Sequence, residues 1–112
     1  GGGLVRLAGL LLGISSVSGG VALIDEIENG FHYTVLPKLW QSLARVARQF
    51  EVQIFATTHS RECIEAAHHA FLEMGDTDFL LHRLERTNGS ILVLTYDPEI
   101  LKAALEAELE VR

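Results

Sequence analysis

Alternating apolar runs and amphipathic segments predict an α/β fold, with parallel strands flanked by helices and followed by a C-terminal β-hairpin and a last helix. The runs "VALID" and "VQIFATTHS" both end in polar residues, and an amphipathic helical segment follows each of them. An Asn-Gly pair then separates two β-like runs near the end. With 112 residues, 48% of them hydrophobic, the chain can form one small domain with a core.

The first half of the chain predicts a helix, a strand and a second helix. Apolar residues recur at helical spacing from Leu4 to Val17, but this stretch is shorter than the ~20 residues that a bilayer helix needs. Arg6 also interrupts it, so we expect a buried core helix and no membrane contact. The continuous run "VALID" is typical of a strand that is buried on both faces of a parallel sheet. The next helix is predicted by an apolar stripe: Leu36, Leu39, Trp40, Leu43, Val46, Ala47 and Phe50.

The second half of the chain repeats the pattern of a strand and a helix, and its apolar residues then follow the alternation of β-strands. "VQIFATTHS" predicts a strand, and Ser60 is placed to cap a helix that carries Ile64 and Phe71. The runs "FLLHRLER" and "SILVLTYD" flank Thr87-Asn88-Gly89 and predict a hairpin. Asp97 followed by Pro98 is a typical start for the last helix.

Charge and cysteine content restrict the class of protein. The formal net charge is −6, and no basic cluster is present to bind duplex nucleic acid. The single cysteine, Cys63, excludes an internal disulfide and is compatible with a reducing compartment. We therefore expect a cytoplasmic protein.

Polar side chains gather where the two predicted parallel strands end. Because the carboxyl ends of parallel strands meet at one edge, we expect these side chains to converge there. Asp-Glu pairs after a strand are most often solvated loop charges. Here Asp25 directly follows a run that should be buried, and a desolvated carboxylate needs a cation or hydrogen-bond donors. Mg²⁺ prefers such oxygen ligands. The candidates are Asp25, Glu26, Glu28, Thr57, Thr58, His59 and Ser60.

Three segments resemble motifs of one family, in that family's order. "VALIDEIENG" resembles the Walker B strand and following loop of ABC-type P-loop ATPases, in particular the SMC, RecF and OLD-like branch. "IFATTHS" resembles the strand that carries the switch histidine, and "GGGLVRLAGLLLGI" resembles a variant of the signature motif that opens a helix. The hairpin and last helix also resemble the end of a small OLD-like ATPase. The resemblance implies a partial P-loop NTPase core of the RecA-like type.

The resemblance implies a role for each matching residue, with ATP and Mg²⁺ as cofactors. Asp25 would contact the Mg²⁺ shell, Glu26 would polarise the attacking water, and His59 would sense the γ-phosphate. Asn29 and Gly30 would lie in the loop that meets a partner subunit. The glycines that open the first helix would bind the γ-phosphate held by the opposite protomer of a homodimer, with free amides and the helix dipole as the attraction: Gly1, Gly2 and Gly3.

The chain departs from the family pattern in two ways. The usual serine of the signature motif is not visible. More importantly, the sequence contains no G-x-x-x-x-G-K-[ST] loop, whose backbone and lysine cradle the phosphates. We therefore expect residues 1–112 to be a single partial ATPase domain whose partner is a Walker A-containing N-terminal half. In the full assembly, DNA or a nuclease domain would be a further partner implied by the resemblance.

Other interpretations use the same residues differently. A metal-dependent phosphoesterase would use Asp25, Glu26, Glu28 and His59 directly as ligands and base. A non-catalytic module would retain only the dimer surface. A zinc site from His59 and Cys63 with the adjacent pair His68-His69 is disfavoured, because one helix cannot easily close a tetrahedral shell, and surface histidines are expected instead. Arg6 would face a phosphate or form a salt bridge.

Overall fold

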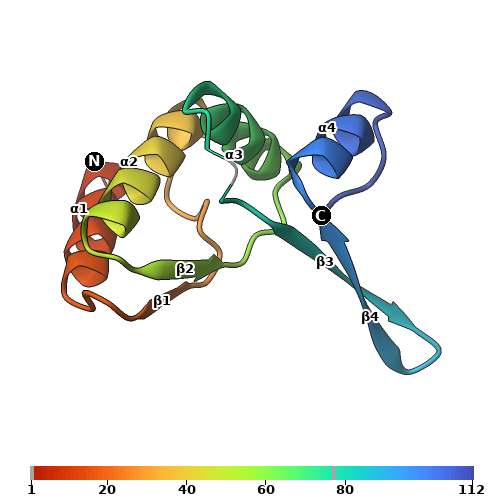
Figure 1. The fold of residues 1–112 in the computed structure, drawn as a ribbon, viewed down its shortest axis with the longest axis horizontal. Helices are drawn as coiled ribbons and strands as arrows, with labels where there is room; N and C mark the ends of the chain where they lie inside the picture. Colours follow the sequence, from red (N-terminus) through yellow and green to blue (C-terminus); the bar gives the residue numbers. More distant parts are fainter. Residues whose placement is uncertain (1, 77) are drawn as a thin grey trace.

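The computed structural model describes residues 2–76 and 78–112 and has a mixed α/β architecture (Figure 1). Its strands form two separate two-stranded sheets, β1 with β2 and β3 with β4. The elements in chain order are α1 (Gly2–Ser15), β1 (Val21–Ile24), the 3₁₀ helix η1 (Tyr33–Val35), α2 (Leu36–Gln49), β2 (Gln53–Ala56), α3 (Arg61–Glu73), β3 (Leu81–Thr87), β4 (Ser90–Tyr96) and α4 (Pro98–Glu106).

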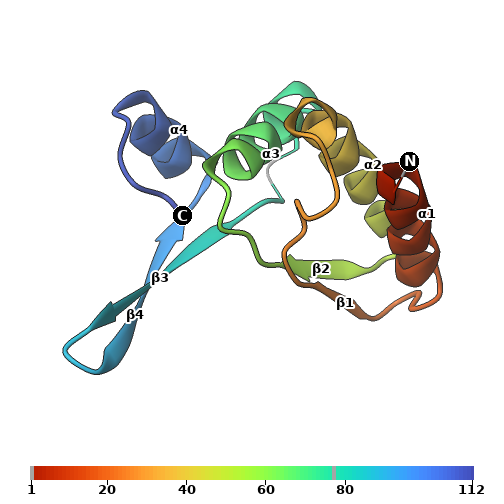
Figure 2. The same ribbon diagram turned by 180° about the vertical axis from the view of Figure 1, so that it is seen from behind.

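The parallel sheet is a β1–α2–β2 unit, as the alternation of runs predicts. β1 pairs with β2 in parallel from Val21 opposite Gln53 to Ile24 opposite Ala56. Helices α1, α2 and α3 all lie on the same side of this sheet in both views (Figures 1 and 2). The other side carries no element of the described chain. One face of the sheet is therefore covered and the other is open.

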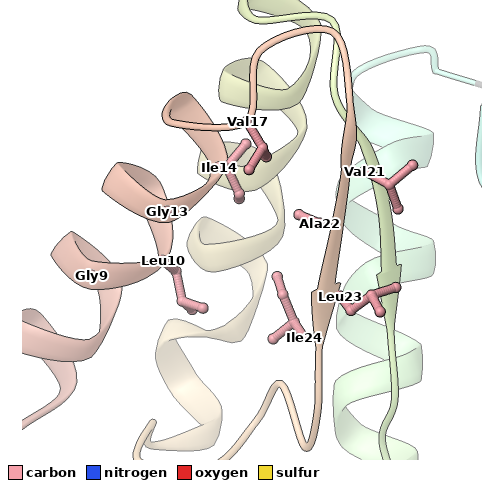
Figure 3. Close-up of a pocket in the computed structure, with 9 residues that line it drawn as sticks. All are labelled: Gly9, Leu10, Gly13, Ile14, Val17, Val21, Ala22, Leu23 and Ile24. Carbon is pink, nitrogen blue, oxygen red and sulfur yellow. The ribbon is translucent and has the colours of Figure 1, made fainter.

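The side chains of β1 alternate between these two faces. Ala22 and Ile24 point toward the helices, whereas Val21 and Leu23 point to the opposite side (Figure 3). Ile24 is buried, but Leu23 is 80% exposed. The expectation that this strand is buried on both faces is therefore wrong for this chain, because helices cover only one face of the sheet.

The main hydrophobic core lies between the helices and the covered face of the sheet. α2 contributes Leu36, Leu39 and Leu43, which confirms the predicted stripe. The indole Nε1 of Trp40 donates a hydrogen bond to the backbone oxygen of Cys63 at 3.1 Å, which joins α2 to α3. The buried members of this core are Ile14, Ile24, Ile27, Leu36, Leu39, Leu43, Val52, Cys63 and Ala66.

Helix α1 is less buried than its sequence predicts. Only Ile14 of this helix is fully buried, while Leu4, Val5 and Leu12 are each at least 70% exposed. The helix packs on α2 with one stripe, so the expectation of a buried core helix holds only for that stripe. A shallow apolar hollow lies between α1 and β1, where Gly9 and Gly13 have no side chain to fill it (Figure 3). No helix in the described residues is long and apolar enough to cross a membrane.

Local chemistry sets the boundaries of the remaining elements where they were predicted. The Ser60 side chain accepts a hydrogen bond from the backbone N–H of Cys63 and caps α3. Asp97 caps α4 in the same way through Ile100. Between β3 and β4, Asn88 and Gly89 have φ values of 52° and 79°, as a tight hairpin turn requires. The hairpin projects away from the helices (Figure 2).

A second, smaller core holds the C-terminal part on α3. Its buried residues come from α3, α4 and the tail, and the rings of Phe71 and Phe79 stack beside it with centroids 4.9 Å apart. Within the described chain no strand connects the hairpin to the parallel sheet. The two sheets stay separate, and both keep free edges. The members of this core are Ile64, Leu101, Ala104 and Val111.

Candidate functional site

The acidic residues after β1 and the "TTHS" segment after β2 meet at one edge of the parallel sheet. The hydroxyl of Thr57 donates a hydrogen bond to the carboxylate of Asp25. In a second contact between the two segments, Glu28 Oε1 accepts a hydrogen bond from the backbone N–H of His59 at 3.4 Å. Both contacts follow from the parallel pairing of β1 with β2. The expectation that the two strand ends meet at one carboxyl edge is confirmed for Asp25, Glu28 and Thr57, whereas His59 takes part through its backbone and the roles of these residues stay a prediction.

Glu26 has an unusual backbone conformation at this edge. Its φ is 47°, in the left-handed region that non-glycine residues rarely adopt. Its N–H donates to Thr57 Oγ1 at 2.9 Å, and its carbonyl oxygen accepts from the N–H of Asn29 at 2.8 Å. Arg6 Nη2 donates to the same oxygen at 3.2 Å. These contacts hold the peptide groups on both sides of Glu26, while its carboxylate remains exposed.

Arg6 joins α1 to the loop that follows β1. Its guanidinium carbon lies 5.7 Å from the centroid of the Phe31 ring, in the geometry of a cation–π contact. Its Nε is buried and has no hydrogen-bond partner among residues 2–76 and 78–112. Of the two expectations for Arg6, the salt bridge is wrong among the described residues, because Arg6 donates to the backbone oxygen of Glu26 and pairs with no carboxylate. The contact with a phosphate stays a prediction.

Gly3 at the start of α1 packs against the same loop. Gly2 and Gly3 begin the helix, and Gly1 lies outside the described residues. A Cβ atom on Gly3 would lie 3.2 Å from the backbone oxygen of Gly30, which is tighter than usual contacts. Gly30 itself has a φ of 85°. The helix start and the Asn29–Gly30 loop are therefore close together at Gly3, and the positive φ of Gly30 favours glycine in the turn.

The carboxylates at the sheet edge are suitable ligands for a hard cation that also binds phosphate oxygens. Asp25 and Glu26 are both exposed, so the expectation of a desolvated carboxylate at Asp25 is wrong. Their carboxylates are still the ligand type that Mg²⁺ prefers. In the described chain, no group of three or more His, Cys, Asp or Glu side chains is close enough to hold a metal ion. Mg²⁺ commonly binds through one or two carboxylates plus substrate phosphates, so such a cluster is not required. The four-residue metal site of a phosphoesterase would require one.

Cys63 is buried close to Thr58 and Glu28, and of the two paired histidines on α3 His68 is buried while His69 is exposed. Burial raises the pKa of the Cys63 thiol, which disfavours the thiolate that a zinc site would need. His68 is buried and its ring lies 5.6 Å from that of His69. The expectation of surface histidines is therefore wrong for His68, because α3 packs this side of the helix against α4.

A known protein family matches the segment that contains this edge. The family described as "AAA domain, putative AbiEii toxin, Type IV TA system" matches residues 1–65, which is more than half of the chain. The chain belongs to this family. No curated protein and no solved structure matches it. The matched part of the AAA domain runs from α1 to the start of α3 and includes Asp25, Glu26 and His59. An ATPase-like domain of this family generally uses ATP and Mg²⁺.

Two contacts that organise the site in this AAA domain are not predicted by the sequence, those of Thr57 and of Arg6. Thr57 was expected at the sheet edge, but its bridge between Asp25 and Glu26 was not. A hydroxyl directly after a strand that pairs with the acidic strand is the signal that identifies it. The contact of Arg6 with a backbone oxygen has no comparable signal, because it depends on how α1 crosses the loop.

Proposed function

We propose that this chain is the C-terminal part of an ABC-type ATPase of the SMC, RecF and OLD-like branch. The observation that carries the proposal is the bridge from Asp25 through Thr57 to the strand end that carries His59. Membership in an AAA domain family supports it. In this proposal the chain supplies the water-activating and phosphate-sensing residues, and a separate segment supplies the phosphate cradle.

The proposed roles follow the chemistry of each side chain. Asp25 holds the Mg²⁺ shell, and Mg²⁺ neutralises charge on the phosphates when it is bound. Glu26 orients and deprotonates the attacking water, because its exposed carboxylate is free to accept a proton. His59 contacts the γ-phosphate. Phosphoryl transfer is catalysed mainly by positioning and charge neutralisation, so these few groups suffice once the phosphates are cradled.

The partner surfaces in this proposal use the parts of the AAA domain that are left open. The phosphate-cradling segment adds a strand to the free edge of β2 and covers the open face of the sheet, where Leu23 and Phe55 are 80% and 50% exposed. Gly3 and the Asn29–Gly30 loop lie together next to the start of α1, and Gly2 precedes them on the helix. In a homodimer this region meets the nucleotide of the partner subunit.

The test joins the chain to an N-terminal segment that carries the G-x-x-x-x-G-K-[ST] loop. We expect Mg²⁺-dependent ATP hydrolysis by the joined protein and almost none by the 112-residue chain, which has no cradle. Glu26→Gln should retain nucleotide binding and lose hydrolysis, because an amide keeps the shape but cannot accept the proton of water. Asp25→Ala should weaken the binding of the Mg²⁺–nucleotide complex itself. Hydrolysis rate and nucleotide affinity are measured for all three joined proteins.

Two results would reject the proposal. Undiminished turnover by the Glu26→Gln protein would exclude this residue as the base. Robust metal-dependent cleavage of nucleic acid by the 112-residue chain alone would favour the phosphoesterase, in which Glu28 and His59 act as direct ligands. Glu99→Gln on α4 is the matched control, since this glutamate lies in the C-terminal part outside the family match and its change should leave the rate within about twofold.

A further inference from the structure

Thr57 occupies the position where the two strand ends are tied together. Its backbone N–H donates to the oxygen of Ile24 at 2.9 Å, and its own oxygen accepts from the N–H of Ile27 at 3.0 Å. The two hydrogen bonds bracket Asp25 and Glu26, the two residues in between. The backbone of Thr57 thus continues the parallel ladder past the end of β1. It fixes the position of the backbone of Asp25 and Glu26 relative to β2.

The Thr57 hydroxyl makes two further contacts whose directions are determined by chemistry. An ionised carboxylate only accepts, so the hydroxyl proton is donated to Asp25. A backbone N–H only donates, so the hydroxyl oxygen accepts from Glu26 at 2.9 Å. One hydroxyl therefore orients the carboxylate of Asp25 and the backbone of Glu26 at once.

The second contact stabilises a conformation that Glu26 would not adopt by itself. A non-glycine residue in the left-handed region costs about 1–2 kcal/mol relative to the right-handed one. The left-handed φ of 47° at Glu26 therefore requires compensation from its surroundings. Thr57 provides it at the N–H, while Arg6 and Asn29 provide it at the carbonyl oxygen.

We propose that Thr57 is a positioning residue that sets the Asp25 carboxylate and the left-handed backbone of Glu26 before any nucleotide binds. Because threonine is β-branched, its χ1 angle is restricted, which favours a fixed hydroxyl over a mobile one. Thr57 also precedes His59 by two residues, so the proposed metal ligand, base and phosphate sensor are all connected through Thr57. The catalytic consequence rests on the proposed function, but the structural link between Thr57 and Glu26 does not.

The structural link is tested on the 112-residue chain without nucleotide. Thr57→Val keeps the shape and removes both hydroxyl contacts, and the exposed position of Thr57 tolerates the change. We expect the Glu26 amide to exchange with solvent about tenfold faster in this variant, as loss of one hydrogen bond predicts. Thr57→Ser keeps the hydroxyl and should restore most of the protection. Thr58→Val is the matched control, because the Thr58 hydroxyl contacts the Ser60 N–H and not the acids.

The catalytic consequence is tested in the protein joined to its phosphate-cradling segment. Thr57→Val should lower kcat about 10- to 100-fold with little change in the KM for ATP, because the reacting groups lose their geometry while the cradle remains. Thr57→Ser should recover most of the rate. An unchanged kcat in the valine variant would overturn the catalytic part of the proposal.

The two measurements test the positioning role of Thr57 separately from the proposed ATPase function. If the Glu26 amide stays protected in Thr57→Val, the positioning role is overturned whatever the hydrolysis rate. If protection is lost in the valine variant and kept in the serine variant, the positioning role is supported. Such a result, combined with a joined wild-type protein that hydrolyses no ATP, would reject only the proposed function.

Discussion

Arg48 on α2 forms an ion pair with the buried carboxylate of Asp76, which follows α3. The side chain of Asp76 is only 4% exposed, whereas that of Arg48 is 62% exposed. A second donor, the N–H of Asp78, binds the other oxygen of Asp76 at 2.9 Å. The pair connects α2 to the segment that follows α3.

Removal of this guanidinium is expected to destabilise the fold. Arg48→Gln leaves the carboxylate of Asp76 buried without its cation, which should lower the free energy of unfolding by about 1–3 kcal/mol. Arg45→Gln on the same helix removes an equal charge from an exposed position and should change the stability by less than about 0.5 kcal/mol. Urea unfolding measures both. Equal effects of the two variants would show that Asp76 needs no partner.

Stability is expected to depend on pH through His68. Burial, followed by the nearby charges of His69 and Lys102, lowers the pKa of His68 below its ordinary value, while Glu106 opposes this shift. The unfolded chain then binds a proton near pH 6.5 that the folded chain does not yet bind. This contribution to stability is therefore complete above that pH and declines as the pH falls toward the folded pKa, by at most about 1.4 kcal/mol per pH unit.

A histidine variant isolates this contribution. His68→Leu should flatten the decline in the free energy of unfolding between neutral and mildly acidic pH. His82→Gln, which removes an exposed histidine of the hairpin, should leave the decline in place. Denaturant titrations at several pH values provide the measurement, and a slope that persists in His68→Leu would assign the effect to other groups.

The open face of the parallel sheet is expected to cause self-association of the isolated chain. Leu23 and Phe55 are opposite each other in the register and are both exposed, next to free strand edges. Leu23→Thr keeps a strand-forming residue and removes apolar surface, so it should weaken association by about tenfold or more. Leu72→Thr on α3 removes a similarly exposed leucine from another surface. Sedimentation equilibrium measures the oligomeric state. A wild-type chain that is monomeric at every concentration would disprove the expectation.

Two glycines are expected to respond to alanine in opposite directions. Gly89 has a φ of 79° in the hairpin turn, so Gly89→Ala should destabilise the hairpin by about 1–2 kcal/mol. Gly9 lies in α1 with nothing within 4 Å of an added Cβ, so Gly9→Ala should stabilise the chain by about 0.5–1 kcal/mol. Amide exchange in β3 and β4 reports the first change and urea unfolding the second. A stable hairpin in Gly89→Ala would contradict the left-handed turn.

Local chemistry made several elements predictable from sequence. Ser60 and Asp97 cap helices because their side chains accept hydrogen bonds from the backbone amides three positions later. Asn88-Gly89 forms the turn because both residues tolerate positive φ. The meeting of Asp25 with Thr57 was predictable as well, since the ends of parallel strands share one edge.

The sequence by itself determined the order and limits of the elements and the edge at which the candidate site lies, because these depend on neighbours along the chain and on a general rule for parallel strands. Tertiary structure alone decided the contact of Arg6 with the Glu26 oxygen, the ion pair of Arg48 with Asp76 and the burial of His68. It also decided that one face of β1 stays open. Each of these depends on which distant surfaces the helices cover, and a periodic pattern states that a face is apolar without stating what packs against it.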